Sequence, residues 1–278
     1  MSNASLPANR KQLYFQAFRT ALPTLIIISL WVSLFALPLV AAKIWRDTAQ
    51  SQLLQKLADD PSLYSTYLSQ EVTWDLISLP TFVIFGIGLY GAHCFAKAYA
   101  FGDGYTASGT FFKGIATDFW RCLATTAMFG ATFFLISFAK NYIGITFGES
   151  GYAVATVLQW VFGAVVACAY TFCLCQMPVY KASIWRLFSN SFLLAFAKLP
   201  QTVLAIAAGY LPLFVAKLVN NDIVTLVIVA VYASIGFAHG TMITTLYCHS
   251  ALDQLVNKRL YPQIYRKGLY DDEQLSDR

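Results

Sequence analysis

The sequence predicts an all-α membrane protein, a six-transmembrane-helix bundle that forms a single polytopic membrane domain over residues 1–278. Two observations carry this prediction. The chain is 58% hydrophobic and only 12% charged, whereas a soluble domain has about 25% charged residues. The apolar residues also gather in runs of about 20, the length that an α-helix needs to cross a bilayer. No soluble core of this length could bury so much apolar surface.

Six apolar runs are the predicted spans, and they lie near residues 22–42, 74–100, 120–139, 152–177, 199–218 and 223–250. The first run is nearly twice as long as the apolar part of a signal peptide, roughly 7–15 residues. We therefore interpret it as an uncleaved anchor, although "LVAAK" at its end resembles a cleavage site.

The remaining parts of the chain are polar. Residues 43–73 are predicted to be an external polar segment, in which Leu53, Leu54, Leu57 and Leu63 have helical spacing. The other connections are short, and residues 251–278 are predicted to be a cytoplasmic tail.

Lys and Arg predict the orientation, because cytoplasmic loops are enriched in these residues. With a cytoplasmic N-terminus, 14 of the 19 basic residues fall on the inside, and the outside retains Lys43, Arg46, Lys56, Lys140 and Lys217. Both termini are therefore expected in the cytoplasm. The net charge of +5 then belongs to a cytoplasmic surface that faces the membrane, and we expect no nucleic-acid partner.

Gly86, Gly88 and Gly91 spell G-x-G-x-x-G, a pattern that is typical of dinucleotide-binding turns. Such a turn needs a preceding strand, a following helix and an acidic residue about twenty positions later. Here the glycines lie inside the second predicted span, and the nearest downstream acids, Asp103 and Asp118, lie in a polar loop. We therefore exclude the nucleotide site.

The alternative role of these glycines is helix packing, because small residues let helix backbones approach each other in lipid. At about 100° per residue, Gly88 and Gly91 share one face of the span and Gly86 lies near the opposite face. Gly236 and Gly240 form a G-x-x-x-G pair in the sixth span. We expect Gly88, Gly91, Gly236 and Gly240 to lie at helix contacts, and Gly86 to lie on the more polar side of its span.

Polar residues inside spans are candidate functional groups. The candidates are His239, His93 and Gln159. Each could make an interhelical hydrogen bond or take part in proton or ligand handling, and the first alternative is favoured because buried polar groups are usually paired. His239 is expected to bridge the sixth span to a Thr, Ser or Tyr on span 2, 3 or 4. His249 and Asp253 form a further pair, but a metal site would need a third ligand.

Sequence motifs of enzymes are not found: there is no H-E-x-x-H, G-x-S-x-G or Walker loop. All six cysteines lie in or at the ends of predicted spans, so no structural disulfide is implied. We expect a non-enzymatic protein without catalytic residues, cofactor or metal.

A short repeat connects the middle of the chain with its second half. "YTAS" at 105–108 and "YKAS" at 180–183 are 75 residues apart. The same shift moves span 2 onto span 4 and span 3 close to span 5. This predicts a parallel repeat of two helical hairpins about an axis along the membrane normal.

Several stretches together resemble the YesL-like family of bacterial membrane proteins: "LWVSLFALPLV" in the first span, "GIGLYGA" with "FGDGYTASGTFFKGIATDFWRC", and "YKASIWRLFSNSFLLAFAKLPQT". The long 43–73 segment departs from the compact first hairpin of that family. The resemblance implies a bacterial inner-membrane protein of unestablished biochemical function, whose relatives are often linked with carbohydrate uptake. Its motifs contain Lys113, Arg186 and Asn190, which are candidate cytoplasmic contact residues.

Two functions are therefore expected. The first is a membrane component that assists or regulates carbohydrate uptake, with the lipid bilayer and a membrane transporter or sensor complex as partners. The alternative is a transport permease, for instance of an ATP-driven importer. Residues 181–200 have the length and the terminal Leu199-Pro200 of a permease coupling loop, but they have Lys181 in place of its leading Glu and Leu187 in place of its central Gly.

Overall fold

The computed structural model describes residues 7–218 and 222–269, and within these ranges every regular element is helical. The all-α prediction is therefore confirmed. The helices are α1 (Arg10–Thr20), α2 (Leu22–Asp59), α3 (Tyr64–Ala100), α4 (Ala107–Thr117), α5 (Phe119–Gln176), α6 (Ile184–Ala197), α7 (Leu199–Leu218), α8 (Asp222–Val231), α9 (Phe237–Leu252) and α10 (Lys258–Leu260). A 3₁₀ turn (Pro61–Leu63) joins α2 to α3, and π-helical turns (Tyr232–Gly236 and Asp253–Asn257) flank α9.

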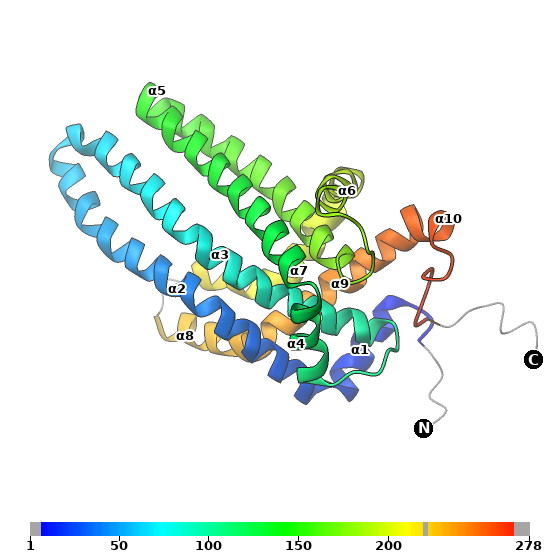
Figure 1. Cartoon of the computed structure of the whole chain (residues 1–278). Helices are drawn as coiled ribbons and strands as arrows, with labels where there is room; N and C mark the ends of the chain where they lie inside the picture. Colours follow the sequence, from blue (N-terminus) through cyan, green and yellow to red (C-terminus); the bar gives the residue numbers. More distant parts are fainter. Residues whose placement is uncertain (1–6, 219–221, 270–278) are drawn as a thin grey trace, which may run out of the picture.

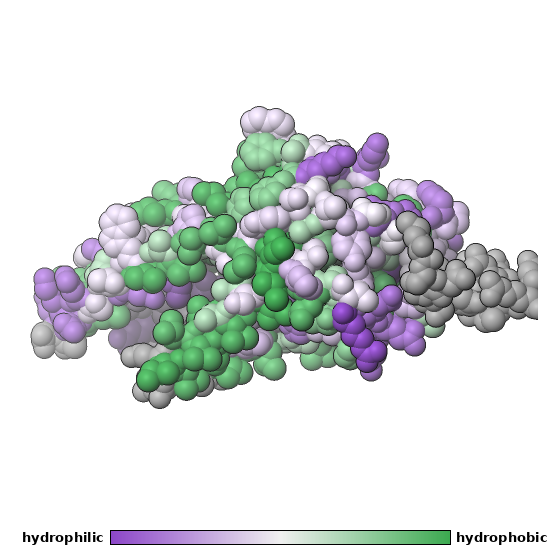
Figure 2. Space-filling view, turned by 90° about the horizontal axis from the view of Figure 1, so that it is seen from below, coloured by the Kyte–Doolittle hydropathy of each residue, from purple (hydrophilic) through white to green (hydrophobic). Residues whose placement is uncertain are grey.

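Several of these helices could cross a membrane. Four helical stretches are long and apolar enough, namely Leu22–Leu57, Tyr64–Ala100, Phe119–Gln176 and Ile223–Leu260. The pair α6 and α7, bent by 97° between them, raises the number to five if it counts as one span. In Figure 2, hydrophobic residues cover much of the middle of the visible face, and hydrophilic residues gather towards its ends. The multi-pass membrane character is thus confirmed, whereas length and hydropathy support four or five spans rather than six.

The longest element, α5, is a helical hairpin. Gly148 interrupts it with a φ of 68° and a ψ of −159°, a conformation that glycine adopts at little cost because it has no Cβ. The Thr126 hydroxyl lies 3.4 Å from the Tyr170 hydroxyl, and the rings of Phe129 and Tyr170 are 5.1 Å apart. The two arms therefore run back along each other, as Figure 1 also shows. They contain the third and fourth predicted spans.

Three single residues, which we call the elbows, each separate a short helix from a long one. They are Ala21 between α1 and α2 (φ −123°, ψ 18°), Asp118 between α4 and α5 (φ −116°, ψ 23°) and Lys198 between α6 and α7 (φ −133°, ψ 28°). Each elbow N–H donates to the carbonyl four residues earlier, and each elbow carbonyl accepts from the N–H four residues later. The same backbone device therefore occurs three times.

Proline explains two of the elbows. Pro23 and Pro200 each lie two residues after an elbow, where proline has no N–H for the preceding turn and its ring would clash with that turn. Asp118 is not followed by proline, but its carboxylate is held by Arg121 one turn later and by Tyr90 of α3. In all three cases the short helix must end before the long helix begins.

The elbows and the turns between the long helices define two ends of the molecule. In Figure 1, α1 and α10 lie at one end, and the α2–α3 turn lies at the other. We call them the elbow end and the tip end. α2 has 38 residues, which corresponds to about 57 Å of helix, roughly twice the bilayer hydrocarbon thickness of about 30 Å. α2 and α3 therefore carry residues 43–73 as helix far towards the tip.

A partly buried ion-pair network holds this extension together. Arg46 of α2 contacts both Glu71 and Asp75 of α3, the second at 3.3 Å. Asp75 also accepts a hydrogen bond from Ser137 of α5. Because Glu71 is only 3% exposed, its charge requires this partner, and the pair fixes the α2–α3 hairpin against α5.

Glycines lie where helices approach most closely. A Cβ on Gly88 would meet Phe35 of α2, one on Gly91 would meet Phe111 and Ile115 of α4, and one on Gly86 would meet Thr126 and Tyr170 of α5. Gly88 and Gly91 therefore pack on a different side from Gly86.

The G-x-x-x-G pair of the sixth predicted span divides. Gly240 of α9 faces Gly209 of α7, and a Cβ on Gly209 would lie 2.9 Å from the Gly240 Cα. Gly236 lies in a π-helical turn, where the atoms nearest to an added Cβ belong to the Tyr232 ring of the same turn. Only Gly240 is thus seen at a backbone-to-backbone contact between helices.

Candidate functional site

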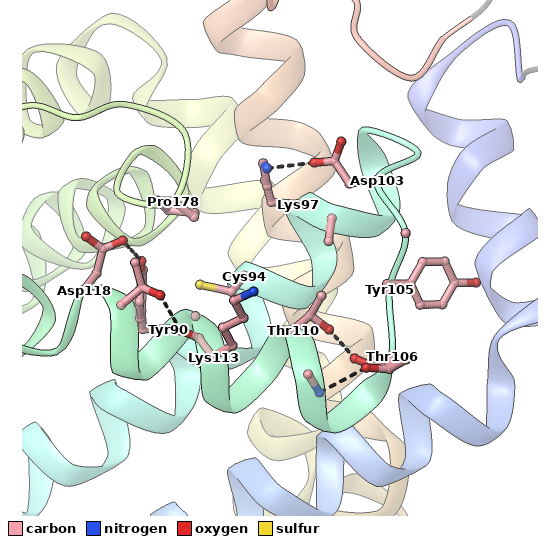
Figure 3. A pocket seen from close by; sticks show the side chains of 15 residues that line it. Tyr90, Cys94, Lys97, Asp103, Tyr105, Thr106, Thr110, Lys113, Asp118 and Pro178 are labelled. Atoms are coloured by element: carbon pink, nitrogen blue, oxygen red, sulfur yellow. Dashed lines mark hydrogen bonds and ion pairs between the residues drawn. The ribbon is translucent and has the colours of Figure 1, made fainter.

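The candidate site is a pocket at the elbow end, which we call the elbow pocket (Figure 3). It has a volume of about 720 Å³, within the range of about 300–1,000 Å³ that is usual for small-molecule sites. Its walls are the last turns of α3, the 101–106 loop, α4 and Pro178 of the α5–α6 loop. The lining residues are Tyr90, Cys94, Lys97, Ala98, Asp103, Gly104, Tyr105, Thr106, Gly109, Thr110, Lys113, Gly114, Thr117, Asp118 and Pro178.

The α3–α4 connection shapes one wall of the pocket. Gly102 turns the chain after α3 with a φ of 68°, and Thr106 then caps α4 by accepting a hydrogen bond from the Gly109 N–H at 3.1 Å. Such a cap satisfies one of the N–H groups that a helix start leaves unpaired. Because α4 begins there, Thr106 and Thr110 present their hydroxyls on the pocket side, as seen in Figure 3.

Asp103 joins three parts of the chain beside this wall. Its carboxylate accepts from Lys97 of α3 at 2.9 Å and from Lys267 of the C-terminal segment at 3.2 Å. Burial alone would raise the pKa of Asp103, but the hydrogen bonds and charges of the two lysines outweigh burial and hold this pKa below its ordinary value. Asp103 is therefore ionised at neutral pH, and it compensates Lys97.

The second pocket carboxylate, Asp118, is compensated as well. The Tyr90 hydroxyl donates to it at 2.8 Å, and Arg121 donates to it at 2.6 Å. Arg121 also donates to the carbonyls of Tyr180 and Ala182, each at 3.0 Å. This network connects the second elbow with the α5–α6 loop and keeps the pocket floor in place.

Lys113 is the pocket cation that lacks a partner. Among the described residues its ammonium has no hydrogen bond and no ion pair, and Figure 3 shows its side chain reaching from α4 into the pocket. Since Asp103 and Asp118 are both bound to other cations, Lys113 is left without a carboxylate partner among the described residues and lies among hydroxyl groups. This arrangement can bind a polar ligand that carries an anionic group.

The predicted intramembrane polar residues lie apart from this pocket. His93 is 2% exposed, and its Nδ1 lies 2.8 Å from the Thr245 hydroxyl of α9 and 3.5 Å from the Cys175 sulfur. His239 does bridge two helices, since its Nδ1 lies 2.7 Å from the Tyr14 hydroxyl. Its partner was predicted on span 2, 3 or 4, and that part is wrong because Tyr14 belongs to α1, which packs against α9.

His249 and Asp253 do not act as a pair in the structure. The His249 ring packs edge-on against Phe101 at 4.9 Å, and Asp253 binds Arg10 at 3.1 Å and Asn257 at 2.8 Å. In the part of the chain that the structure describes, no three His, Cys, Asp or Glu side chains come together to hold a metal.

The candidate cytoplasmic contact residues are exposed at the elbow end but separate from one another. Lys113 lines the elbow pocket. Asn190 lines a smaller hollow of about 260 Å³ between α6 and the chain near Tyr261, and Arg186 is exposed on α6. Gln159 lies elsewhere, in a groove between the arms of α5 and α7.

Sequence reasoning missed most of the pocket. Tyr90 and Cys94 lie in an apolar run, and only the fold turns them towards α4. The sequence places Asp103 and Asp118 in a polar loop and assigns them no role, although "FGDGYTASGT" concentrates the glycines and hydroxyls that form the wall.

Comparisons of the chain with protein-family models, with curated proteins and with solved structures find no match. The resemblance to the YesL-like family stays a prediction, and the function is argued from the site itself.

Proposed function

We propose that this protein crosses a bacterial cytoplasmic membrane six times, with both termini in the cytoplasm, and assists or regulates carbohydrate uptake without catalysing a reaction. In this proposal the elbow pocket binds a phosphorylated or carboxylated sugar on the cytoplasmic side. The observation that carries the proposal is the Lys113 ammonium, which lacks a carboxylate partner among the described residues, in a hydroxyl-rich pocket. The uptake role and the bacterial membrane rest on the YesL-like resemblance.

The architecture supports six spans. α5 contributes two when its arms are counted separately at Gly148, and α7 contributes one because α6, bent by 97° from it, would lie along the membrane surface. Together with α2, α3 and the α8–α9 helix this makes three hairpins, each preceded by a short helix and an elbow. These hairpins differ from the expected repeat, which paired spans 2 and 3 with spans 4 and 5, because here the hairpins join spans 1 and 2, 3 and 4, and 5 and 6.

The charge distribution supports the orientation. Basic residues from every part of the chain gather at the elbow end, including Lys97, Lys113, Arg121, Lys258 and Lys267. Cytoplasmic faces are enriched in such residues, so the elbow pocket would open to the cytoplasm, where sugar phosphates occur.

The buried side chains below the elbow pocket favour ligand binding over transport of a ligand through the bundle. Along the first arm of α5, Cys122, Thr126 and Phe129 follow Asp118 and are completely buried. Phe129 packs against Tyr170, Phe188 and Phe192 of neighbouring segments. These side chains separate the elbow pocket from the groove at the other half of the bundle. A permease of an ATP-driven importer remains the second candidate, through the 181–200 loop.

Ligand binding tests the pocket. Purified full-length protein in detergent should melt at higher temperature with glucose 6-phosphate than with glucose or inorganic phosphate alone. Lys113→Gln should weaken glucose 6-phosphate binding about tenfold, the loss expected for one charge-assisted hydrogen bond. The matched control is Lys181→Gln, another exposed lysine at the elbow end that does not line the pocket. Equal binding by both variants would refute the proposed site.

A second experiment separates the accessory role from the permease. A photo-crosslinking residue at Arg186 should capture a membrane transporter or a sensor in intact cells. Sugar movement by the purified chain in proteoliposomes, or capture of an ATPase subunit, would favour the permease and contradict the accessory role.

A further inference from the structure

A second cavity lies on the side of the bundle and not at its end. It is a groove of about 680 Å³ between the two arms of α5 and α7. Its rim is exposed, since Trp160 is 71% and Val203 is 40% exposed. A Cβ on Gly163 would find no heavy atom within 4 Å, so the groove is open at that glycine. In a membrane this opening faces the lipid chains.

Polarity changes along the groove in one direction. On the second arm of α5, Gln159 is followed by Gly163 and then by Ala167, so the amide lies at the tip side and the small apolar residues lie deeper. On the first arm, Phe133 and Ile136 lie deeper and Lys140 lies at the tip side. Because the arms are antiparallel, both place their polar residue at the same end of the groove. The groove therefore has a polar head and an apolar body, like a lipid.

The position of the polar head matches a membrane surface. Helix rise places Lys140 about 33 Å along the first arm from the Asp118 elbow, and the hydrocarbon layer is about 30 Å thick. If the elbows lie at one surface, Lys140 reaches the headgroup level of the opposite leaflet. The apolar residues Val203 and Ile206 of α7 then border the part of the groove that lies inside the hydrocarbon layer.

Charge selects the headgroup. Arg46 also lines the groove, but it is bound to Glu71 and Asp75. The Lys140 ammonium lies 5.0 Å from the centre of the Tyr152 ring, and among the described residues it has no carboxylate partner. The Gln159 amide likewise has no hydrogen-bond partner there. The polar end thus offers one free cation and, deeper, one free amide.

We propose that this groove holds one anionic phospholipid from the leaflet at the tip end. Its phosphate binds Lys140, an ester carbonyl accepts a hydrogen bond from the Gln159 amide, and one acyl chain lies along Gly163 and Ala167 towards Ile206. The site is independent of the elbow pocket and of its sugar ligand. Helix packing explains neither the half-buried position of Lys140 nor the lack of contacts at Gly163, and a bound lipid accounts for both.

Native mass spectrometry of the detergent-purified full chain tests this site. The chain is titrated with phosphatidylglycerol or with phosphatidylethanolamine, and the bound lipids are counted. We expect one phosphatidylglycerol to bind in preference to phosphatidylethanolamine. Lys140→Gln should reduce that preference about fivefold, the effect of one lysine near an anionic lipid surface. Gly163→Phe, which fills the groove, should remove the bound lipid.

Two variants are the controls. Lys43→Gln removes an exposed lysine at a similar height on α2 that is paired with Asp47, and Ala131→Phe adds the same ring to an exposed position on the first arm of α5. Both should retain the wild-type lipid. The proposal is overturned if wild type shows no preference for phosphatidylglycerol, if Gly163→Phe retains the lipid, or if Gly163→Phe instead dissociates a dimer in the same spectra, which would make the groove a protein interface.

Discussion

The contact between Gly209 of α7 and Gly240 of α9 makes a quantitative prediction about stability. A Cβ added to Gly209 would lie 2.9 Å from the Gly240 Cα and 3.2 Å from the Gly240 carbonyl oxygen. Both atoms belong to the backbone, so α7 and α9 must separate to admit the methyl group. Overpacking of this kind costs about 1–3 kcal/mol. The elbow pocket is remote from this contact, so Gly209→Ala should alter stability and not ligand binding.

Gly163→Ala, compared after both variants have been delipidated, is the matched control, because no protein atom lies within 4 Å of its added Cβ. Both substitutions gain the same helix propensity of about 1 kcal/mol, so the difference between them isolates the packing cost. At about 2–4 °C per kcal/mol for a protein of this size, a cost of about 1–3 kcal/mol means that Gly209→Ala should melt roughly 2–12 °C below Gly163→Ala in the same detergent. If Gly209→Ala melts at the same temperature or higher, α7 and α9 do not meet at these glycines.

Three further predictions concern topology, the histidine bridge and the C-terminal segment. In a cysteine-free background, a cysteine at Ser51 should react with an impermeant maleimide in whole cells and one at Lys267 should not; the opposite pattern contradicts the orientation. His239→Gln should fold and bind glucose 6-phosphate like wild type, because an amide can also bond to Tyr14; a folded variant that no longer binds would contradict a purely structural bridge. The backbone amides of residues 261–269 should be equally protected from hydrogen exchange at pH 5 and pH 8, after correction for intrinsic exchange rates. The Asp103 pKa is lowered from 3.8, so its stabilisation is present above that value and is lost only as pH falls below it; a change between pH 5 and 8 would refute this assignment.

Hydropathy predicted the long helices because a run such as 152–177 has the same apolar character whatever it packs against. It could not predict how far the helices continue. α2 extends to Asp59 and α3 begins at Tyr64, although residues 43–73 are polar. The leucines of this segment have helical spacing in the sequence. The helices are nevertheless stabilised by a tertiary contact, because Arg46 of α2 pairs with Glu71 of α3.

The elbow pocket was less accessible to sequence reasoning than the helices. Lys113 was selected through a resemblance, yet its importance in the structure comes from the pairing of Asp103 and Asp118 with other cations. Whether a charge is compensated depends on partners that are distant in the chain, such as Lys267 for Asp103. Counting charged residues along the sequence gives the sign of the net charge on one face of the protein. It does not show which ammonium group on that face lacks a partner.

The three elbows are a likeness between parts of the chain that the sequence does not reveal. Ala21, Asp118 and Lys198 have nearly the same backbone angles and hydrogen bonds, but they share no side-chain chemistry. Four residues after each elbow lies a side chain that is completely buried, and these are Leu25, Cys122 and Thr202. The residue four positions after the elbow is therefore buried in all three cases, although its type differs.

The variation among elbows has a consequence for function. An elbow only has to end one helix and begin another, and proline does this at Pro23 and Pro200 without any polar side chain. The second elbow uses a carboxylate instead, and Asp118 is the elbow that lines the pocket and binds Tyr90 and Arg121. Two residues after the second elbow lies Trp120, where the other two units have Pro23 and Pro200, so this elbow lacks the proline and is held by the Asp118 carboxylate. Of the three elbow residues, Asp118 is the one that lines the elbow pocket, and we therefore propose that the ligand binds at the second elbow.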